Sequence, residues 1–263
     1  MLARLWRERG DYRRAGLLLA LTLAATEQAY GPYSTRVATV CNEWGVLGKY
    51  SGHFDQSQNL YLRALEILQQ TYGENHDSVA TVCHNLGGLA HARGRHDQGE
   101  PWAARAVQIR TRIHGPDHLL VAADAAAWAS LLEGCGRLDE AEDQLKLALR
   151  TFVQLHGEEH HEISVTWHNL AAVQYRRGQY LHAKQGFTQT LALKERLLGL
   201  THPDLAVTLV NLAAACRRLS EEEQARAHYS RAVAILEPQV LPGHPTLAAA
   251  KRGLAAPTQD VRP

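Results

Sequence analysis

Histidine is the residue whose number and spacing in this chain suggest chemistry most directly. The chain holds 15 histidines among 263 residues, and imidazole both binds transition metals and carries protons near neutral pH. Five of them recur at one constant interval, at His76, His118, His160, His202 and His244. Helices of successive repeats pack about 10 Å apart, whereas zinc ligands lie about 2 Å from the metal. We therefore interpret these five histidines as residues at which helices begin, and we predict no metal site.

Other patterns that would indicate catalysis are missing from the sequence. It contains no Gly-rich phosphate loop, no Gly-x-Ser-x-Gly turn and no His-Glu-x-x-His pair. Its four cysteines form no Cys-x-x-Cys pair, and Cys41 and Cys83 are separated by the same interval as the histidines, which indicates a small buried side chain at one place of a repeat. Free thiols fit a reducing compartment. We therefore expect a cytoplasmic protein that is not an enzyme and needs no cofactor.

Two series of glycines repeat with the same 42-residue period. One contains Gly31, Gly73, Gly115, Gly157 and Gly199, and the other contains Gly10, Gly52, Gly94, Gly136 and Gly178 and continues at Ser220. A fixed period between about 20 and 50 residues is typical of stacked repeats. Glycine in the middle and at the end of each repeat predicts two antiparallel helices per repeat, with Pro203 as a first helical residue in the fifth. The predicted fold class is all-α, an α-solenoid of stacked antiparallel helix pairs.

These series also define the predicted domain. A partial repeat at 1–31 precedes five full repeats, at 32–73, 74–115, 116–157, 158–199 and 200–241. A terminal helix at 244–254 ends a single solenoid that spans 1–254, and a flexible tail is expected at 255–263.

The first 29 residues allow a competing interpretation. Five arginines precede the apolar run GLLLALTLAA, as in a signal peptide. Gly10, Ala15 and Gly31 nevertheless keep the repeat register, so we interpret the run as the second helix of a repeat. The run is also shorter than the roughly 20 residues that span a bilayer, and we expect no membrane insertion.

The packing positions of the fourth repeat follow a known pattern. They are Trp167, Leu170, Ala171, Ala183 and Phe187. Their spacing resembles that of tetratricopeptide repeats. The 42-residue period, the pair His202-Pro203, the Asn-Leu-Ala runs at 169–171 and 211–213, and the closing Leu198-Gly199 are similar to the kinesin light chain variety. The resemblance covers nearly the whole chain, and it implies a right-handed superhelix whose concave groove binds a protein or a peptide.

Each repeat contains a first helix, before its middle glycine, and a second helix after it. The face of the first helix that lies opposite the packing residues is expected to line this groove. At 100° per residue, this face of the fourth repeat contains His168, Asn169 and Arg176, and Lys49 and His91 are groove positions of earlier repeats. The candidate peptide-binding residues are His84, Asn85, His168, Asn169, Tyr175, Arg176, Asn211, Arg217 and Arg218. Asparagine can bond to an extended peptide backbone, and arginine can pair with carboxylates. We therefore predict a groove for an acidic or C-terminal peptide segment, centred on the C-terminal half.

The sequence also allows two alternative roles and predicts one further contact. The chain could be the regulatory or sensor region of a larger multidomain signalling protein, because its first repeat is incomplete and solenoids normally end in capping repeats. A nucleic-acid binder is less favoured, since 28 basic and 27 acidic residues leave almost no net charge. The apolar run from Leu17 to Leu23 predicts self-association through terminal helices.

Overall fold

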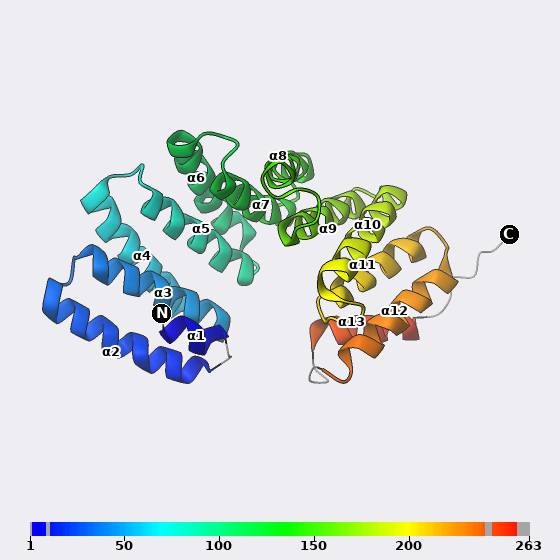
Figure 1. Cartoon of the computed structure of the whole chain (residues 1–263), viewed down its shortest axis with the longest axis horizontal. Coiled ribbons are helices and arrows are strands. Elements are labelled where there is room, and N and C mark those ends of the chain that lie inside the picture. The colour runs from blue at the N-terminus through cyan, green and yellow to red at the C-terminus, as the bar shows by residue number, and fades with distance from the viewer. Residues whose placement is uncertain (1, 9–10, 240–243, 257–263) are drawn as a thin grey trace. The chain divides into compact units, whose positions relative to one another are not determined.

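A computed structural model of the chain describes residues 2–8, 11–239 and 244–256 (Figure 1). Within these residues all regular structure is helical, with thirteen helices and no strand. Consecutive helices pack against each other in pairs, so the predicted all-α fold of stacked helix pairs is confirmed.

The helix bounds follow the predicted repeats. The first seven helices are α1 (Leu2–Glu8), α2 (Tyr12–Tyr30), α3 (Thr35–Ser51), α4 (Phe54–Tyr72), α5 (Asp77–Ala92), α6 (His96–His114) and α7 (Leu119–Gly134). The remaining six are α8 (Leu138–His156), α9 (His161–Arg176), α10 (Tyr180–Leu198), α11 (Leu205–Arg218), α12 (Glu222–Leu236) and α13 (Pro245–Ala255). Each full repeat contributes two helices, and residues 257–263 of the predicted tail lie outside the described residues.

The turn inside each helix pair requires a backbone conformation that favours glycine. At Gly94 the φ angle is 68°, in the left-handed region where a Cβ atom crowds the following carbonyl. The N–H of Arg95 donates to the carbonyl of Ala90 at 2.9 Å and so closes the end of α5. Ser220 takes the equivalent place after α11 with a φ of 63°. The turn geometry is therefore kept even where serine replaces the glycine.

Helix entry is the role that the structure gives to the periodic histidines. Nδ1 of His76 accepts a hydrogen bond from the N–H of Ser78 at 3.2 Å, and Nδ1 of His118 accepts one from Leu120 at 3.2 Å. These bonds satisfy amide groups that have no partner within the first helical turn. The interpretation of these histidines as helix-entry residues is confirmed at both positions.

The fifth repeat begins differently from the prediction. The expectation that Pro203 is the first helical residue is wrong, because α11 begins at Leu205. The N–H of Leu205 donates to the carbonyl of His202 at 3.1 Å, and that of Ala206 donates to Pro203 at 3.0 Å. These i to i+3 bonds form a tight turn that delays the α-helical pattern.

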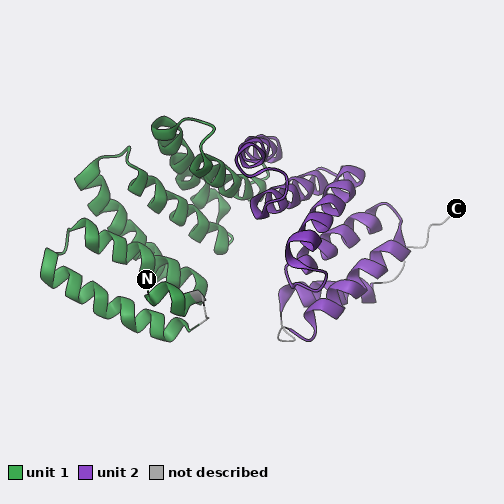
Figure 2. Ribbon diagram, viewed as in Figure 1, with its two compact units in different colours: residues 1–137 green, residues 138–263 purple. Residues whose placement is uncertain are grey.

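Contacts divide the described chain into two compact units, residues 1–137 with α1–α7 and residues 138–263 with α8–α13 (Figure 2). Unit 1 has a core that includes Cys41, Tyr61 and Cys83, all fully buried, as the spacing of the two cysteines predicts. The core of unit 2 contains Phe187 and Tyr229. In each unit the apolar stripes of paired helices meet, which fixes the rotation of each helix and therefore the face that its polar residues occupy.

Candidate functional site

The predicted groove residues lie on the first helix of each repeat's helix pair, and several are bonded to a neighbouring first helix of the same unit. In unit 1, Nδ2 of Asn85 on α5 donates to Oδ1 of Asn42 on α3 at 2.8 Å. Both side chains are half-buried. An amide has two N–H groups and one carbonyl oxygen, so this single bond leaves the amide N–H groups of Asn42 and the carbonyl oxygen of Asn85 for other partners.

His168 in unit 2 makes an equivalent bridge with both of its ring nitrogens. Nε2 lies 3.1 Å from Nδ2 of Asn211, and Nδ1 lies 3.2 Å from Oγ1 of Thr208. Burial, followed by the nearby charge of Lys194, lowers the pKa of His168 to about 4. The ring is therefore neutral at pH 7, with Nδ1–H donating to Thr208 and Nε2 accepting from Asn211.

His84 occupies the position in unit 1 that corresponds to His168, yet its ring is held differently. Its Nδ1 lies 2.7 Å from Oδ1 of Asp124 on α7, and the Asp124 side chain is 1% exposed. The carboxylate accepts, so Nδ1 of His84 must donate. The His84 side chain is 37% exposed, so unit 1 presents an oriented imidazole at its surface.

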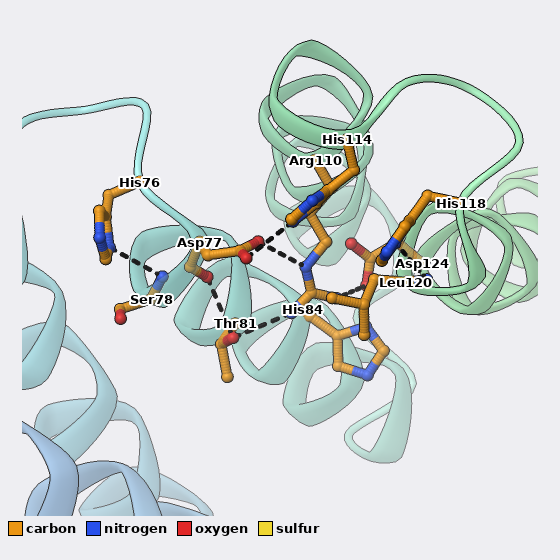
Figure 3. A network of polar contacts seen from close by, with 10 residues as sticks. All are labelled: His76, Asp77, Ser78, Thr81, His84, Arg110, His114, His118, Leu120 and Asp124. Atoms are coloured by element: carbon orange, nitrogen blue, oxygen red, sulfur yellow. Dashed lines mark hydrogen bonds and ion pairs between the residues drawn. The ribbon is translucent and has the colours of Figure 1, made fainter.

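Arg110 bonds to Asp124 and extends this polar network to α5 (Figure 3). It extends from α6, with Nη1 2.8 Å from Oδ1 of Asp124 and Nη2 2.9 Å from Oγ1 of Thr81 on α5. Its Nε lies 3.6 Å from Oδ1 of Asp77. A second-helix arginine thus connects two first helices, and its buried charge is paired with carboxylates.

Unit 2 repeats this arrangement without the carboxylates. Lys194 on α10 takes the place of Arg110, and it donates to Oγ1 of Thr208 at 3.1 Å and to the carbonyl of Asp204 at 3.3 Å. Burial lowers the pKa of Lys194, and the charge of Asp204 raises it. Sequence reasoning missed both networks, although Arg110 and Lys194 stand two repeat periods apart, as do Asp124 and Thr208, and this spacing is a detectable signal.

The remaining predicted residues occupy different environments. Tyr175 packs edge-on against Tyr180, with ring centroids 5.3 Å apart. Arg218 lies over the Tyr180 ring, 4.6 Å from its centroid, and donates to the Tyr180 hydroxyl at 2.5 Å. Arg176 is exposed, and Asn169 is half-buried.

Arg217 is directed away from these residues toward α12 and α13. Its guanidinium donates to Glu222 at 2.8 Å and to the carbonyl of Gly253 at 2.8 Å, and the Glu222 hydrogen bond raises its pKa. Arg217 therefore joins three helices, and its donors are engaged within unit 2. This placement separates Arg217 from Arg218, although the two residues are neighbours in sequence.

Within the described part of the chain, no group of three or more His, Cys, Asp or Glu side chains is arranged to hold a metal ion. Among the described helices, none combines the length and the apolar character needed to cross a membrane.

The tetratricopeptide repeat family matches most of this chain. One description of the repeat matches residues 42–98, 121–195 and 162–237, and a second matches residues 79–120. No curated protein matches the chain at a significant level.

Several solved structures are similar to it. BtubC (BKLC) from P. vanneervenii has a TM-score of 0.73 and 21% identity over 88% of this chain and 94% of its own. The nearly identical repeats of a putative kinesin light chain from Podosopora anserina have a TM-score of 0.65 and 20% identity over 79% and 98%. NprR in complex with its cognate peptide NprX has a TM-score of 0.64 and 14% identity over 97% and 68%. These likenesses concern the fold.

Proposed function

Because this chain belongs to the tetratricopeptide repeat family, with repeats of the kinesin light chain type, we propose that it is a non-enzymatic scaffold that binds a protein or peptide segment. The ligand lies along the first helices of the repeats, where the His and Asn side chains are found.

The observation that carries this proposal is the Asn85–Asn42 bond. It holds two amides in fixed positions on neighbouring helices, so little side-chain entropy is lost when a ligand binds. The unused amide N–H groups and carbonyl oxygen match the alternating acceptors and donors of an extended peptide. Asn211, which is held by His168, offers the same chemistry in unit 2.

The acidic preference within this proposal rests on fewer arginines than the sequence predicts. Arg217 is engaged by Glu222 and Gly253, so we assign it to the packing of unit 2. Arg218 is exposed and oriented by Tyr180, so we assign it to the basic side of the ligand face in unit 2.

A similar solved structure supports a regulatory alternative. NprR from B. thuringiensis is described as a quorum sensor, and its match with this chain covers 95% of this chain but 68% of NprR. A repeat region of this kind can therefore be part of a longer regulator. In that case the same face would bind a signalling peptide. The balanced charge of the chain continues to disfavour nucleic acid.

Peptide selection followed by paired substitutions tests the proposal. A random peptide library is displayed and selected on the full chain, and the affinities of the enriched peptides are measured by calorimetry. The double variant N85A/N211A removes two amides of the binding face. We expect it to weaken binding by about tenfold or more, because each lost hydrogen bond contributes about 1 kcal/mol.

The control removes two exposed amides from second helices. Gln108 on α6 and Gln189 on α10 are exposed, and Q108A/Q189A should leave the affinities unchanged. Circular dichroism verifies that both double variants keep their helicity. Failure to enrich any peptide, or equal weakening by both double variants, would show that the first-helix face is not the binding surface.

A further inference from the structure

In each unit an arginine at the turn after a first helix closes the space beside the preceding second helix. After α5, Nη2 of Arg93 lies 2.8 Å from Oδ1 of Asp55, and Nη1 donates to Oε1 of Gln58 at 3.1 Å. Both partners lie on α4, the second helix of the preceding repeat. After α9, Arg177 bonds in the same way to two acidic residues of α8. These bonds tie the turn to the preceding second helix.

The corresponding place between α2 and α3 lacks this closure. The residues one repeat period before Asp55, Gln58 and Arg93 are, in that order, Arg13, Gly16 and Ser51. Gly16 has no side chain, and the hydroxyl of Ser51 donates to the carbonyl of Leu47 within its own helix at 3.1 Å. A cavity of about 510 Å³ remains there, whereas the equivalent cavity beside Arg93 measures about 50 Å³.

This α2–α3 cavity has apolar walls and an arginine at its rim. Trp44 and Leu47 of α3 line it together with apolar residues of α2, and Trp44 is half-buried. Ser51 and His53 also line it, but their side chains bond to each other at 2.9 Å. Arg13 is exposed, and among the described residues no acidic group pairs with it. The charge of Arg13 is therefore available to a ligand.

The α2–α3 cavity lies away from the ligand face of the proposed function. Trp44 follows Asn42 by two residues, so it lies on nearly the opposite side of α3. A peptide bound to the amides of the first helices and a ligand in the cavity would be separated by the body of α3. The cavity is therefore a separate place for binding.

We propose that the α2–α3 cavity binds a small aromatic carboxylate. The inference is independent of the proposed function. Sites for small molecules measure about 300–1,000 Å³ and combine apolar walls with a few polar groups that orient the ligand. The aromatic ring packs against Trp44 and Leu47, which removes apolar area from water. The carboxylate compensates the unpaired charge of Arg13 at the rim.

Fluorine NMR of the full chain labelled with fluorotryptophan tests the site, because it reports on Trp44 directly. The Trp44 resonance is identified as the one that W44F removes. The chain is titrated with 2-naphthoate and, separately, with 2-naphthamide, a neutral molecule of nearly the same shape. We expect naphthoate to shift the Trp44 resonance to saturation and to bind about threefold more tightly than the amide, the effect of one exposed ion pair.

Two variants separate the charge from the cavity. R13Q should remove the preference for naphthoate and leave the affinity for naphthamide unchanged. R13D/G16Q/S51R introduces the residue types of the closed place beside α4 and should abolish binding of both molecules. A Cβ atom on Gly16 would meet the Leu47 side chain at 3.7 Å, an ordinary contact, and circular dichroism verifies the fold. R150Q removes an exposed arginine of α8 and is the matched control that should change neither affinity.

Several outcomes would overturn the site. Naphthoate could leave the Trp44 resonance unshifted, shift all tryptophan resonances alike, or bind the triple variant as tightly as the natural chain. Equal weakening by R13Q and R150Q would indicate general charge attraction. Leu17 also lines the cavity, so a Trp44 resonance that responds to protein concentration and not to naphthoate would assign the cavity to a second copy of the chain. None of these measurements involves a peptide, so such a failure leaves the proposed function standing.

Discussion

His84 and His168 show how strongly one residue type depends on its neighbours. Both lie at the same place in repeats that are two periods apart. His84 donates to the buried carboxylate of Asp124 and keeps Nε2 at the surface. His168 is bonded through both nitrogens to Thr208 and Asn211. The partner on the following first helix is Asp124 in unit 1 and Thr208 in unit 2. This difference decides whether the imidazole is available to a ligand or is part of the packing.

The His168 environment predicts how stability depends on pH. The unfolded histidine has a pKa of about 6.5, and the folded residue has a pKa of about 4. Between these values the unfolded state binds more protons at this residue, so the contribution of His168 to the free energy of unfolding should fall by a few kcal/mol as pH decreases from about 6.5 to 4. Urea unfolding at pH 7.5 and pH 4.5 measures the loss.

The variant H168Q should lose less stability than the natural chain between these two pH values. H161Q, which replaces an exposed histidine of the same helix, serves as the control and should behave like the natural chain. Equal losses in H168Q and the natural chain would mean that His168 is not the residue responsible.

At the scale of the helices, a basic residue on a second helix bonds to the following first helix in each unit. In unit 1 the connection runs through Arg110 to Thr81 on α5 and Asp124 on α7. In unit 2 it runs through Lys194 to Thr208 on α11. Bonds of this kind fix the register between neighbouring helices, which the apolar contacts alone specify less tightly.

Asp124 should therefore be among the most sensitive polar residues of unit 1. D124N keeps the shape of the side chain but leaves the buried Arg110 without its closest negative charge, at 2.8 Å in the natural chain. We expect a loss of about 3 kcal/mol in the free energy of unfolding, measured by urea titration. D139N alters an aspartate that is 95% exposed and pairs with Arg177, and it should cost less than about 1 kcal/mol. A D124N variant as stable as D139N would contradict the assigned role.

At the scale of the molecule, α2 carries apolar side chains that are largely exposed. Leu17 and Leu21 lie one turn apart on α2 and are 59% and 71% exposed. The predicted self-association through terminal helices places them in the contact. Sedimentation velocity of the natural chain should then show an average mass that rises with concentration, because apolar area is removed from water when two chains meet.

The double variant L17Q/L21Q should sediment as a monomer at every concentration. Leu181 and Leu200 are similarly exposed, at 56% and 65%, and L181Q/L200Q is the matched control that should still associate. A natural chain that stays monomeric throughout the concentration series would refute the prediction.

The sequence by itself determines the helix pairs and the turns that separate their helices. Turns at positions such as Gly94 and Ser220, and helix entries at His76 and His118, depend on residues within a few positions of each other, so a 42-residue period transmits them from repeat to repeat. The same period identifies Cys41 and Cys83 as core residues, since burial follows the helical stripe. Local geometry made these features predictable.

Only the tertiary structure decides which polar side chains face a ligand. Arg217 and Arg218 are adjacent and were predicted to act together, but one bonds to Glu222 and Gly253 while the other lies over Tyr180. The physical reason is that successive residues point about 100° apart on a helix, so adjacent side chains meet different elements. Their partners come from elsewhere in the chain, as Asp124 does for His84 at a separation of 40 residues, and no local pattern specifies such a contact.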